Sequence, residues 1–229
     1  MIPIYIGYDS KEKEPFVTLI YSILKHAACP LAIIPLKKEL FIEFYYRERH
    51  PLQSTEFSFT RFLVPYLNKY EGWAIYMDCD MLCMRNIQDL WNLRCSDYSV
   101  MVVPHNHVPE EQTKFLNQHQ TKYYRKNWSS MMLFNCSKCS VLTPEMVQSA
   151  DGLKLHQFGW LQYNEIGFLP ENWNYLVQNE FYTGEEKLGL VHFTTGGPWF
   201  KEYQNVPYAD EWYETRDEML NDEAIIYAN

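Results

Sequence analysis

The chain has 229 residues, of which 47% are hydrophobic and 21% charged, and its formal net charge is −9. This composition excludes a disordered or low-complexity chain, and the length suffices to bury a substantial core. The acidic charge argues against a broad surface for nucleic acid or anionic lipid. No stretch reaches the ~20 apolar residues that a membrane span needs, and the start of the chain lacks the basic region of a signal peptide. We therefore expect a cytoplasmic protein.

Short apolar runs alternate with helical patterns along the chain. The runs that predict strands are 2–7, 31–36, 73–77, 98–103, 131–134 and 188–193. The segments that predict helices are 16–24, 57–70, 110–126, a turn opened by Thr143-Pro144, and 209–221. This alternation is typical of an α/β fold with a mostly parallel central sheet flanked by helices. We expect one domain over residues 1–207, with 208–229 as an acidic helical segment of the same domain.

Polar residues follow three of the predicted strands: Gly7-Tyr8-Asp9, Asp78-Cys79-Asp80 and His192. In parallel α/β sheets, ligands bind at the carboxyl ends of the strands. We therefore expect the three clusters to share one edge of the sheet and to form the functional site.

Asp78 and Asp80 are the strongest candidates for a metal site. Residues i and i+2 of extended backbone point the same way, so both carboxylates can reach one cation, and carboxylate oxygens suit Mg²⁺ or Mn²⁺. A solvated strand end is the plainer interpretation of such a pair. His192 precedes the Gly196-Gly197 turn, and an added imidazole shifts the preference toward Mn²⁺.

Arg61 and the cysteines leave alternatives open. Arg61 lies in an apolar, aromatic stretch, where it either pairs with a carboxylate or meets a phosphate or sugar of a ligand. Cys136 and Cys139 form a CxxC that could build a zinc site with Cys79 and Cys83, although a single CxxC is a weak signal.

Over roughly residues 2–200 the sequence resembles the nucleotide-sugar glycosyltransferases of the GT-A fold, in particular the glycogenin-like family 8. The resemblance rests on the order and spacing of five segments. They are Gly7-Tyr8-Asp9, Arg61, Asp78-Cys79-Asp80, the following Asn86-Ile87-Gln88-Asp89-Leu90, and His192 to Trp199. A looser resemblance, to glycosyltransferases of chlorella viruses, would place the protein in a host cytoplasm.

The family 8 resemblance implies a UDP-sugar donor, a glycan or other hydroxyl acceptor, and Mn²⁺, with Mg²⁺ as the other possible metal. It implies a role for each matching residue. Asp78, Asp80 and His192 would hold the metal. Gly7, Tyr8, Asp9, Arg61, Cys79, Gly196 and Gly197 would contact the nucleotide or its diphosphate. Ser129, Ser130, His156, Gln157 and Trp199 would lie near the donor sugar or the acceptor.

Two departures from the family pattern limit this transfer of roles. Gly197 precedes Pro198 where the family has a Lys, and His156-Gln157 stands where the family has an Asp-Gln pair. The sequence therefore leaves retention or inversion of the anomeric configuration undecided. An inverting enzyme needs a carboxylate base, and the candidates are Asp151, Glu165, Asp210 and Glu211.

Two other functions compete with glycosyl transfer. A phosphatase of the haloacid dehalogenase type also carries D-x-D after an apolar strand, but that pattern wants Gly-Thr where this chain has Met81-Leu82. A non-catalytic carbohydrate-binding module would explain the many aromatic residues but not the paired carboxylates. Trp160, Trp173 and Trp199 could form a sugar-stacking platform or belong to the core.

Overall fold

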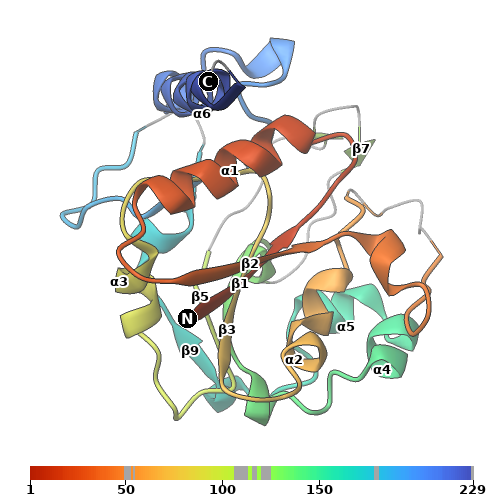
Figure 1. Cartoon of the computed structure of the whole chain (residues 1–229). Coiled ribbons are helices and arrows are strands. Elements are labelled where there is room, and N and C mark those ends of the chain that lie inside the picture. Colours follow the sequence, from red (N-terminus) through yellow and green to blue (C-terminus); the bar gives the residue numbers. More distant parts are fainter. Residues whose placement is uncertain are drawn as a thin grey trace.

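The computed structural model describes residues 1–48, 53, 55–105, 113–114, 118–119, 125–177 and 181–227 (Figure 1). Its main sheet has six strands in the order β2-β1-β3-β8-β5-β9. Their bounds are β1 Ile2–Gly7, β2 Leu31–Leu36, β3 Trp73–Met77, β5 Val100–Val102, β8 Met131–Asn135 and β9 Ile166–Phe168. Only β8 runs antiparallel to its neighbours in this sheet. The expected mostly parallel α/β sheet is therefore confirmed, with β2 at an edge.

A second sheet, in the order β10-β11-β4, lies beside the first. It consists of β4 Met81–Cys83, β10 Tyr175–Leu176 and β11 Leu190–His192. His192 pairs with Met81 across the antiparallel β11–β4 ladder. The strand predicted at 188–193 thus exists, but it belongs to this second sheet and not to the main one.

A short hairpin replaces part of the helix that we expected over residues 110–126. Strands β6 Thr113–Lys114 and β7 Gln118–His119 pair antiparallel, and most of the remaining positions lie outside the described residues. The segment is polar and lacks apolar residues at regular helical spacing, so its sequence indicated a helix only weakly.

The helices cover the sheets from several sides (Figure 1). They are α1 Lys13–Lys25, α2 Val64–Leu67, α3 Ile87–Asn92, α4 Pro144–Ser149, α5 Gly152–His156 and α6 Ala209–Tyr227. Thr143 caps α4 as its sequence indicates, because its side chain accepts a hydrogen bond from the Met146 N–H. The helix predicted over 57–70 is shorter, since a 3₁₀ turn (η2, Thr60–Leu63) leads into α2 near Pro65.

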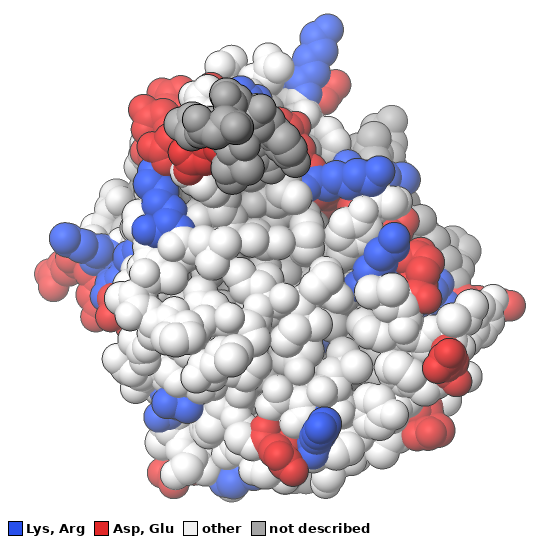
Figure 2. Space-filling view, viewed as in Figure 1, with Lys and Arg blue, Asp and Glu red and all other residues white. Residues whose placement is uncertain are grey.

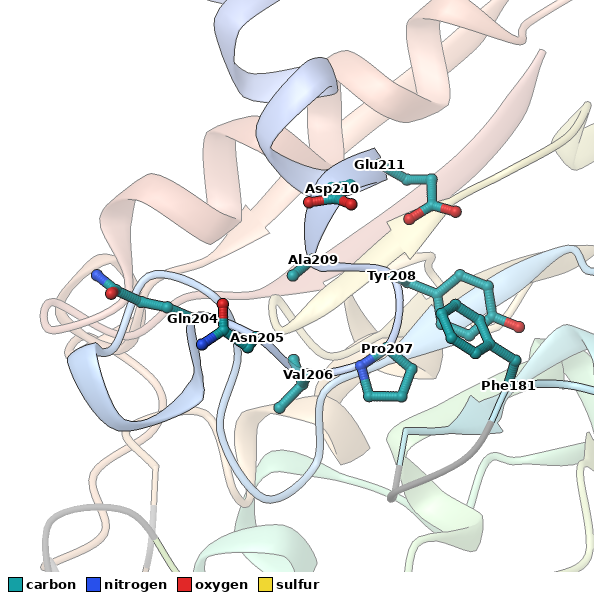
Figure 3. Close-up of a pocket in the computed structure, with 9 residues that line it drawn as sticks. All are labelled: Phe181, Gln204, Asn205, Val206, Pro207, Tyr208, Ala209, Asp210 and Glu211. Atoms are coloured by element: carbon teal, nitrogen blue, oxygen red, sulfur yellow. The ribbon is translucent and has the colours of Figure 1, made fainter.

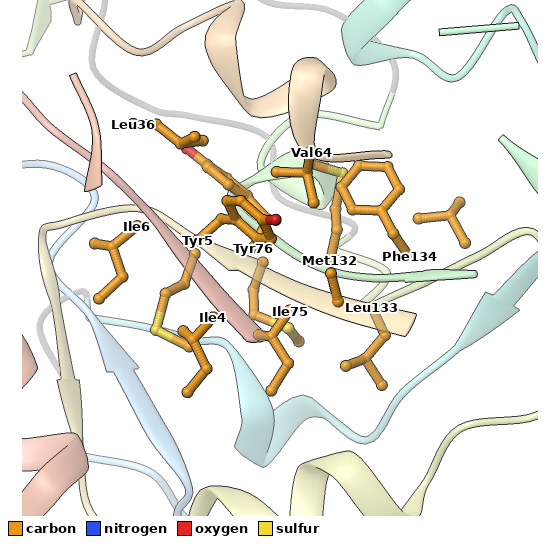
Figure 4. Close-up of a cluster of buried hydrophobic side chains, with 14 of the residues drawn as sticks. Ile4, Tyr5, Ile6, Leu36, Val64, Ile75, Tyr76, Met132, Leu133 and Phe134 are labelled. Carbon is orange, nitrogen blue, oxygen red and sulfur yellow. The ribbon is translucent and has the colours of Figure 1, made fainter. Parts of the chain in front are cut away.

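The main core lies between the sheet and the helices, where side chains of β1, β3 and β8 interdigitate (Figure 4). Ile4, Ile75 and Leu133 are completely buried there. A second, smaller cluster joins α6 to the second sheet. It consists of Leu82, Val177, Val191, Phe193, Tyr208 and Trp212.

Helix α6 also contacts α1, which lies between it and the strands of the main sheet (Figure 1). Tyr21 Oη donates to an Asp222 carboxylate oxygen at 2.6 Å, and Lys25 pairs with Glu218. On these contacts we propose that 208–229 belongs to the same domain as 1–207. Acidic side chains gather around α6, whereas the centre of the face in view is uncharged (Figure 2). Among the described residues, no helix has the length and apolarity that crossing a membrane requires.

Candidate metal and nucleotide site

The Asp78-Cys79-Asp80 motif lies at the junction of the two sheets. Strand β3 ends at Met77 and β4 begins at Met81, so three residues carry the chain from one sheet to the other. The ends of β1 and β3 lie side by side, because Ile6 pairs with Met77. Two of the three expected clusters therefore do share the edge of the main sheet. His192 reaches the same place from the second sheet, which corrects the expectation of a single edge.

Asp78, Asp80 and His192 converge as a potential metal site. One ligand atom from each of the three residues lies within 4.8 Å of the others. His192 Nε2 is 3.2 Å from Asp80 Oδ1. Asp78 and His192 are buried, and Asp80 is half-buried. Two carboxylates and one imidazole form a donor set that suits Mn²⁺, so these residues fit the metal that the family resemblance implies.

Arg61 pairs with Asp78, which is one of the two alternatives that its sequence context left open. Arg61 Nη2 is 3.1 Å from Asp78 Oδ1, and the Tyr76 hydroxyl donates to the same oxygen at 2.5 Å. Burial raises the pKa of Asp78, although the positive charge of Arg61 opposes this shift. Arg61 Nη1 also donates to the Ser129 carbonyl at 2.8 Å. The arginine therefore links the metal-ligand motif to the segment before β8.

Asn174 fixes the orientation of His192. The Ser130 hydroxyl donates to the Asn127 carbonyl at 2.6 Å, so its oxygen accepts from Asn174 Nδ2 at 2.9 Å. Asn174 Oδ1 then faces His192 Nδ1 at 3.0 Å, and that nitrogen carries the proton. The lone pair of Nε2 is consequently directed to the Asp80 side, where a metal ligand needs it. No sequence pattern marked Asn174, because its role depends on contacts between distant segments.

His156 joins the same network through Ser129. Its Nδ1 lies 2.8 Å from the Ser129 hydroxyl, and its ring contacts Phe59 and Phe62. Burial and the charges of Arg61 and Arg47 hold the pKa of His156 well below its ordinary value, so it stays neutral. Its neighbour Gln157 accepts a hydrogen bond from Arg125 through its backbone carbonyl.

Glu12 is an acidic residue of this region that the sequence reasoning missed. Its side chain is 2% exposed, and one oxygen accepts a hydrogen bond from the Cys79 thiol at 3.8 Å. Burial and the charges of Asp80, Asp9 and Asp78 raise its pKa to about 9. The sequence feature that could have identified Glu12 is its position between the first strand and the first helix. Acidic residues are also common at the start of ordinary helices, so this feature is not specific.

Cys79 and the residues after β1 have close packing roles. Cys79 is fully buried, and its thiol donates to a carboxylate oxygen of Glu12. A Cβ on Gly7 would lie 2.5 Å from the Phe57 ring. Asp9 is buried and accepts hydrogen bonds from the Lys11 and Glu56 N–H groups. The Tyr8 ring packs edge-on against Phe16.

The loop after His192 is shaped by its own aromatic residues. Gly196 has φ +155°, and a Cβ there would lie 2.6 Å from the Tyr203 ring. A Cβ on Gly197 would lie 2.0 Å from Trp199. Trp199 packs against Phe193 and Trp212 in the second cluster. Both glycines are therefore required for this loop to fold, apart from any contact with a phosphate.

Comparison with known proteins identifies the family. The model of the glycosyl transferase family 8 matches residues 21–141. Protein CDI of Arabidopsis thaliana is 42% identical over 228 residues, which cover 94% of this chain and 86% of that protein. The chain belongs to glycosyl transferase family 8. This membership displaces the phosphatase alternative, and the comparisons give no support to the viral resemblance.

Solved structures show the same GT-A fold at low sequence identity. The galactosyltransferase LgtC, in complex with donor and acceptor sugar analogs, has a TM-score of 0.61 and 13% identity, and the match covers 95% of this chain and 96% of LgtC. GlyE of Streptococcus pneumoniae has a TM-score of 0.64 and 12% identity, with 99% of this chain and 63% of GlyE covered. The bifunctional glycosyltransferase WbbM has a TM-score of 0.64 and 14% identity, with 94% of this chain covered. The chain spans about half of WbbM, 49% of its length.

Within this family 8 fold, two of the candidate bases have structural partners elsewhere. Asp151 caps α5 by accepting from the Leu153 and Lys154 N–H groups. Glu165 accepts from the Gln162 N–H and from the Ser99 hydroxyl, before the start of β9. Because β9 runs parallel to β3 in the sheet, Glu165 lies at the edge opposite the metal-ligand motif.

Asp210 and Glu211 lie at the start of α6, beside a pocket of about 460 Å³ (Figure 3). Phe181 and Tyr208 form its aromatic wall. Val191 and Phe193 face this helix, whereas His192 between them faces Asp80. The structure thus places these two acids across β11 from the metal-ligand cluster and does not bring them together with it.

Proposed function

We propose that this chain transfers a sugar from a UDP-sugar to a hydroxyl of a glycan or other acceptor. Mn²⁺ is the expected metal and Mg²⁺ the other candidate, held by Asp78, Asp80 and His192. The observation that carries the proposal is the convergence of these three ligand atoms within 4.8 Å at the strand end of a GT-A fold. When bound, a divalent cation supplies Lewis-acid neutralisation of the charge that develops on a leaving diphosphate.

The residues around the cluster support this assignment by their charges. The protein carries a formal net charge of −9, so an anionic diphosphate needs local positive charge. Arg61 supplies one fixed cation beside Asp78, and the metal would supply the other. His156 stays neutral because of its lowered pKa, so it can exchange hydrogen bonds with hydroxyl groups without adding charge.

Gly7, Tyr8 and Asp9 are the proposed uridine-binding segment. They follow β1, whose end lies beside the end of β3. The Asp9 carboxylate accepts hydrogen bonds from the backbone N–H groups of Lys11 and Glu56. These bonds hold the segment in one conformation before a ligand binds. The proposed sites for the donor sugar remain Ser129, Ser130 and His156, which surround Arg61 and Asn174.

Calorimetric titration of UDP into the purified protein, with and without Mn²⁺, tests the proposal. We expect binding that appears only with the metal, and much weaker binding of UMP, because one phosphate cannot occupy the diphosphate position. A panel of UDP-sugars then identifies the donor by its metal-dependent hydrolysis. Absence of UDP binding under both conditions would refute the proposed function.

A further inference from the structure

Three aromatic rings lead outward from the candidate site, and we call Trp128, Phe168 and Tyr163 the aromatic row. Trp128 packs edge-on against Phe168 with ring centroids 5.7 Å apart, and Phe168 packs against Tyr163 at 6.0 Å. Trp128 is 6% exposed, Phe168 46% and Tyr163 60%. The row therefore begins in the core and ends in solvent.

The inner end of the row adjoins the candidate site. Trp128 directly precedes Ser129 and Ser130, which contact Arg61, His156 and Asn174. The outer end lies on β9, the edge strand of the main sheet, and Phe168 is the last residue of that strand. Three strand spacings separate β9 from β3, which amounts to about 14 Å. This separation is larger than one sugar ring.

Arg125 adds a polar group along the row. Its guanidinium lies 5.4 Å from the ring centres of both Trp128 and Tyr163. Its Nη1 donates to the Gln157 carbonyl at 2.7 Å, which keeps it beside the His156 segment. Arg125 and Asn127 have φ of 61° and 65°, an unfavourable conformation for residues with a side chain. Strained backbone of this kind accumulates at functional sites.

The core does not need the outer rings. Neither Phe168 nor Tyr163 is buried, so both rings offer apolar area to a ligand. The three tryptophans that the sequence offered as a platform have packing roles. Trp173 is buried, Trp160 packs against the main core, and Trp199 packs against the second cluster.

We propose that the aromatic row binds a sugar of a saccharide acceptor, remote from the hydroxyl that reacts. The apolar C–H face of a pyranose stacks on an exposed aromatic ring, and the Arg125 guanidinium lies beside these rings. Because the exposed outer end of the row lies about three strand spacings from the metal-ligand motif, a sugar stacked there is not the one that receives the transferred group. The acceptor is therefore an oligosaccharide of several sugars. This inference rests on the proposed function.

The test measures glycan retention and nucleotide binding separately. The intact protein, with UDP and Mn²⁺, is applied to an array of defined oligosaccharides of one to eight sugars. We expect retention of longer members of at least one series. The double variant Tyr163→Ala/Phe168→Ala should weaken that retention by at least about tenfold, the loss typical of removing aromatic contacts from a binding site.

Two further variants make the result specific to the rings. Phe181→Ala removes an equally exposed aromatic at the α6 pocket and should leave glycan retention unchanged. Tyr163→Leu keeps apolar bulk without a flat ring and should also lose retention. Metal-dependent UDP binding should be unaltered in all variants, which reports that the fold and the nucleotide site are intact.

The possible failures are distinguishable. Absence of metal-dependent UDP binding by the unmodified protein would refute the proposed function. Intact UDP binding with no retained glycan, or with retention that survives the double variant, would overturn the inference alone.

Discussion

The two carboxylates of the Asp78-Cys79-Asp80 motif lie in different surroundings. Asp78 has partners that belong to the main-sheet region, since Tyr76 donates to it at 2.5 Å and Arg61 lies 3.1 Å away. Asp80 faces His192, which arrives on β11 of the second sheet. One carboxylate is largely compensated by the protein itself, and the other faces an imidazole nitrogen with which it could share a metal ion. We infer that Asp78 stabilises the fold as well as the site, whereas Asp80 serves mainly the site.

The largest effect should come from Asp80→Asn, which breaks the site on the His192 side. Replacing this carboxylate by an amide should lower metal-dependent sugar transfer by at least about 10³-fold, because an uncharged amide oxygen binds a divalent cation weakly. The melting temperature should change by only a few degrees. Transfer and calorimetric UDP binding are measured with Asp97→Asn, an exposed acid, as the control. Retained Mn²⁺-dependent affinity in the folded Asp80→Asn variant would remove Asp80 from the ligand set.

Asp78→Asn should instead affect stability. It leaves the Arg61 guanidinium buried without its counter-charge, and breaking a buried pair in this way costs about 3–5 kcal/mol. Urea denaturation of the metal-free protein measures this loss. The double variant Arg61→Met/Asp78→Asn should recover part of the loss, because the unpaired charge is then gone. An Asp78→Asn variant as stable as the unmodified protein would contradict the contrast between the two carboxylates.

Asn174→Ala should have a smaller effect, which we expect on the metal affinity of the site through His192. Without Asn174 Oδ1, the proton of His192 is no longer held on Nδ1, and loss of such a partner costs about 10–100-fold in metal affinity. Mn²⁺ affinity is measured by competition with a fluorescent chelator. Asn86→Ala, which removes a helix cap distant from the site, controls for general loss of stability. Equal metal affinity in Asn174→Ala would show that the histidine is oriented without it.

Glu12→Gln should have the smallest effect on sugar transfer, and its main signature should be a pH dependence of stability. The folded protein raises the pKa of Glu12 from the ordinary 4.5 to about 9, so the folded state holds this proton more tightly than the unfolded state does. Its stabilising contribution is complete below pH 4.5 and is lost as the pH rises toward 9. Glutamine is uncharged throughout, so the melting temperature of metal-free Glu12→Gln should exceed that of the unmodified protein increasingly between pH 5 and 9. Glu39→Gln, at an exposed position, should show no such trend.

The part of the site formed by neighbouring residues was predictable from sequence. The part formed by residues distant in sequence was predictable only in part. The apolar run 73–77 followed by Asp78 and Asp80 fixes a buried strand and two side chains on one face. The position of His192 at a strand end predicted that it joins the site, but its arrival on a second sheet depends on the β11–β4 register. Asn174 and Glu12 were missed because their importance arises from burial and from partners that are distant in sequence.

Aromatic residues illustrate the same limit. Composition indicated an abundance of rings but could not separate Trp173, which fills the core, from Tyr163 and Phe168, which reach solvent. The difference depends on which strand lies at the edge of the sheet. Strand β9 was not predicted, since its three residues are too few for a detectable period.

The crossing of the chain at Asp78-Cys79-Asp80 has a mechanical consequence. Asp78 is anchored to one sheet through Arg61 and Tyr76, while Asp80 and His192 are attached to the other, so a cation shared among them would be a reversible cross-link between the sheets. Any ligand that binds only the folded state raises its stability in proportion to the logarithm of the ligand concentration. Filling this site would therefore stabilise the junction between the two sheets, and the free energy of unfolding would rise with the concentration of the cation.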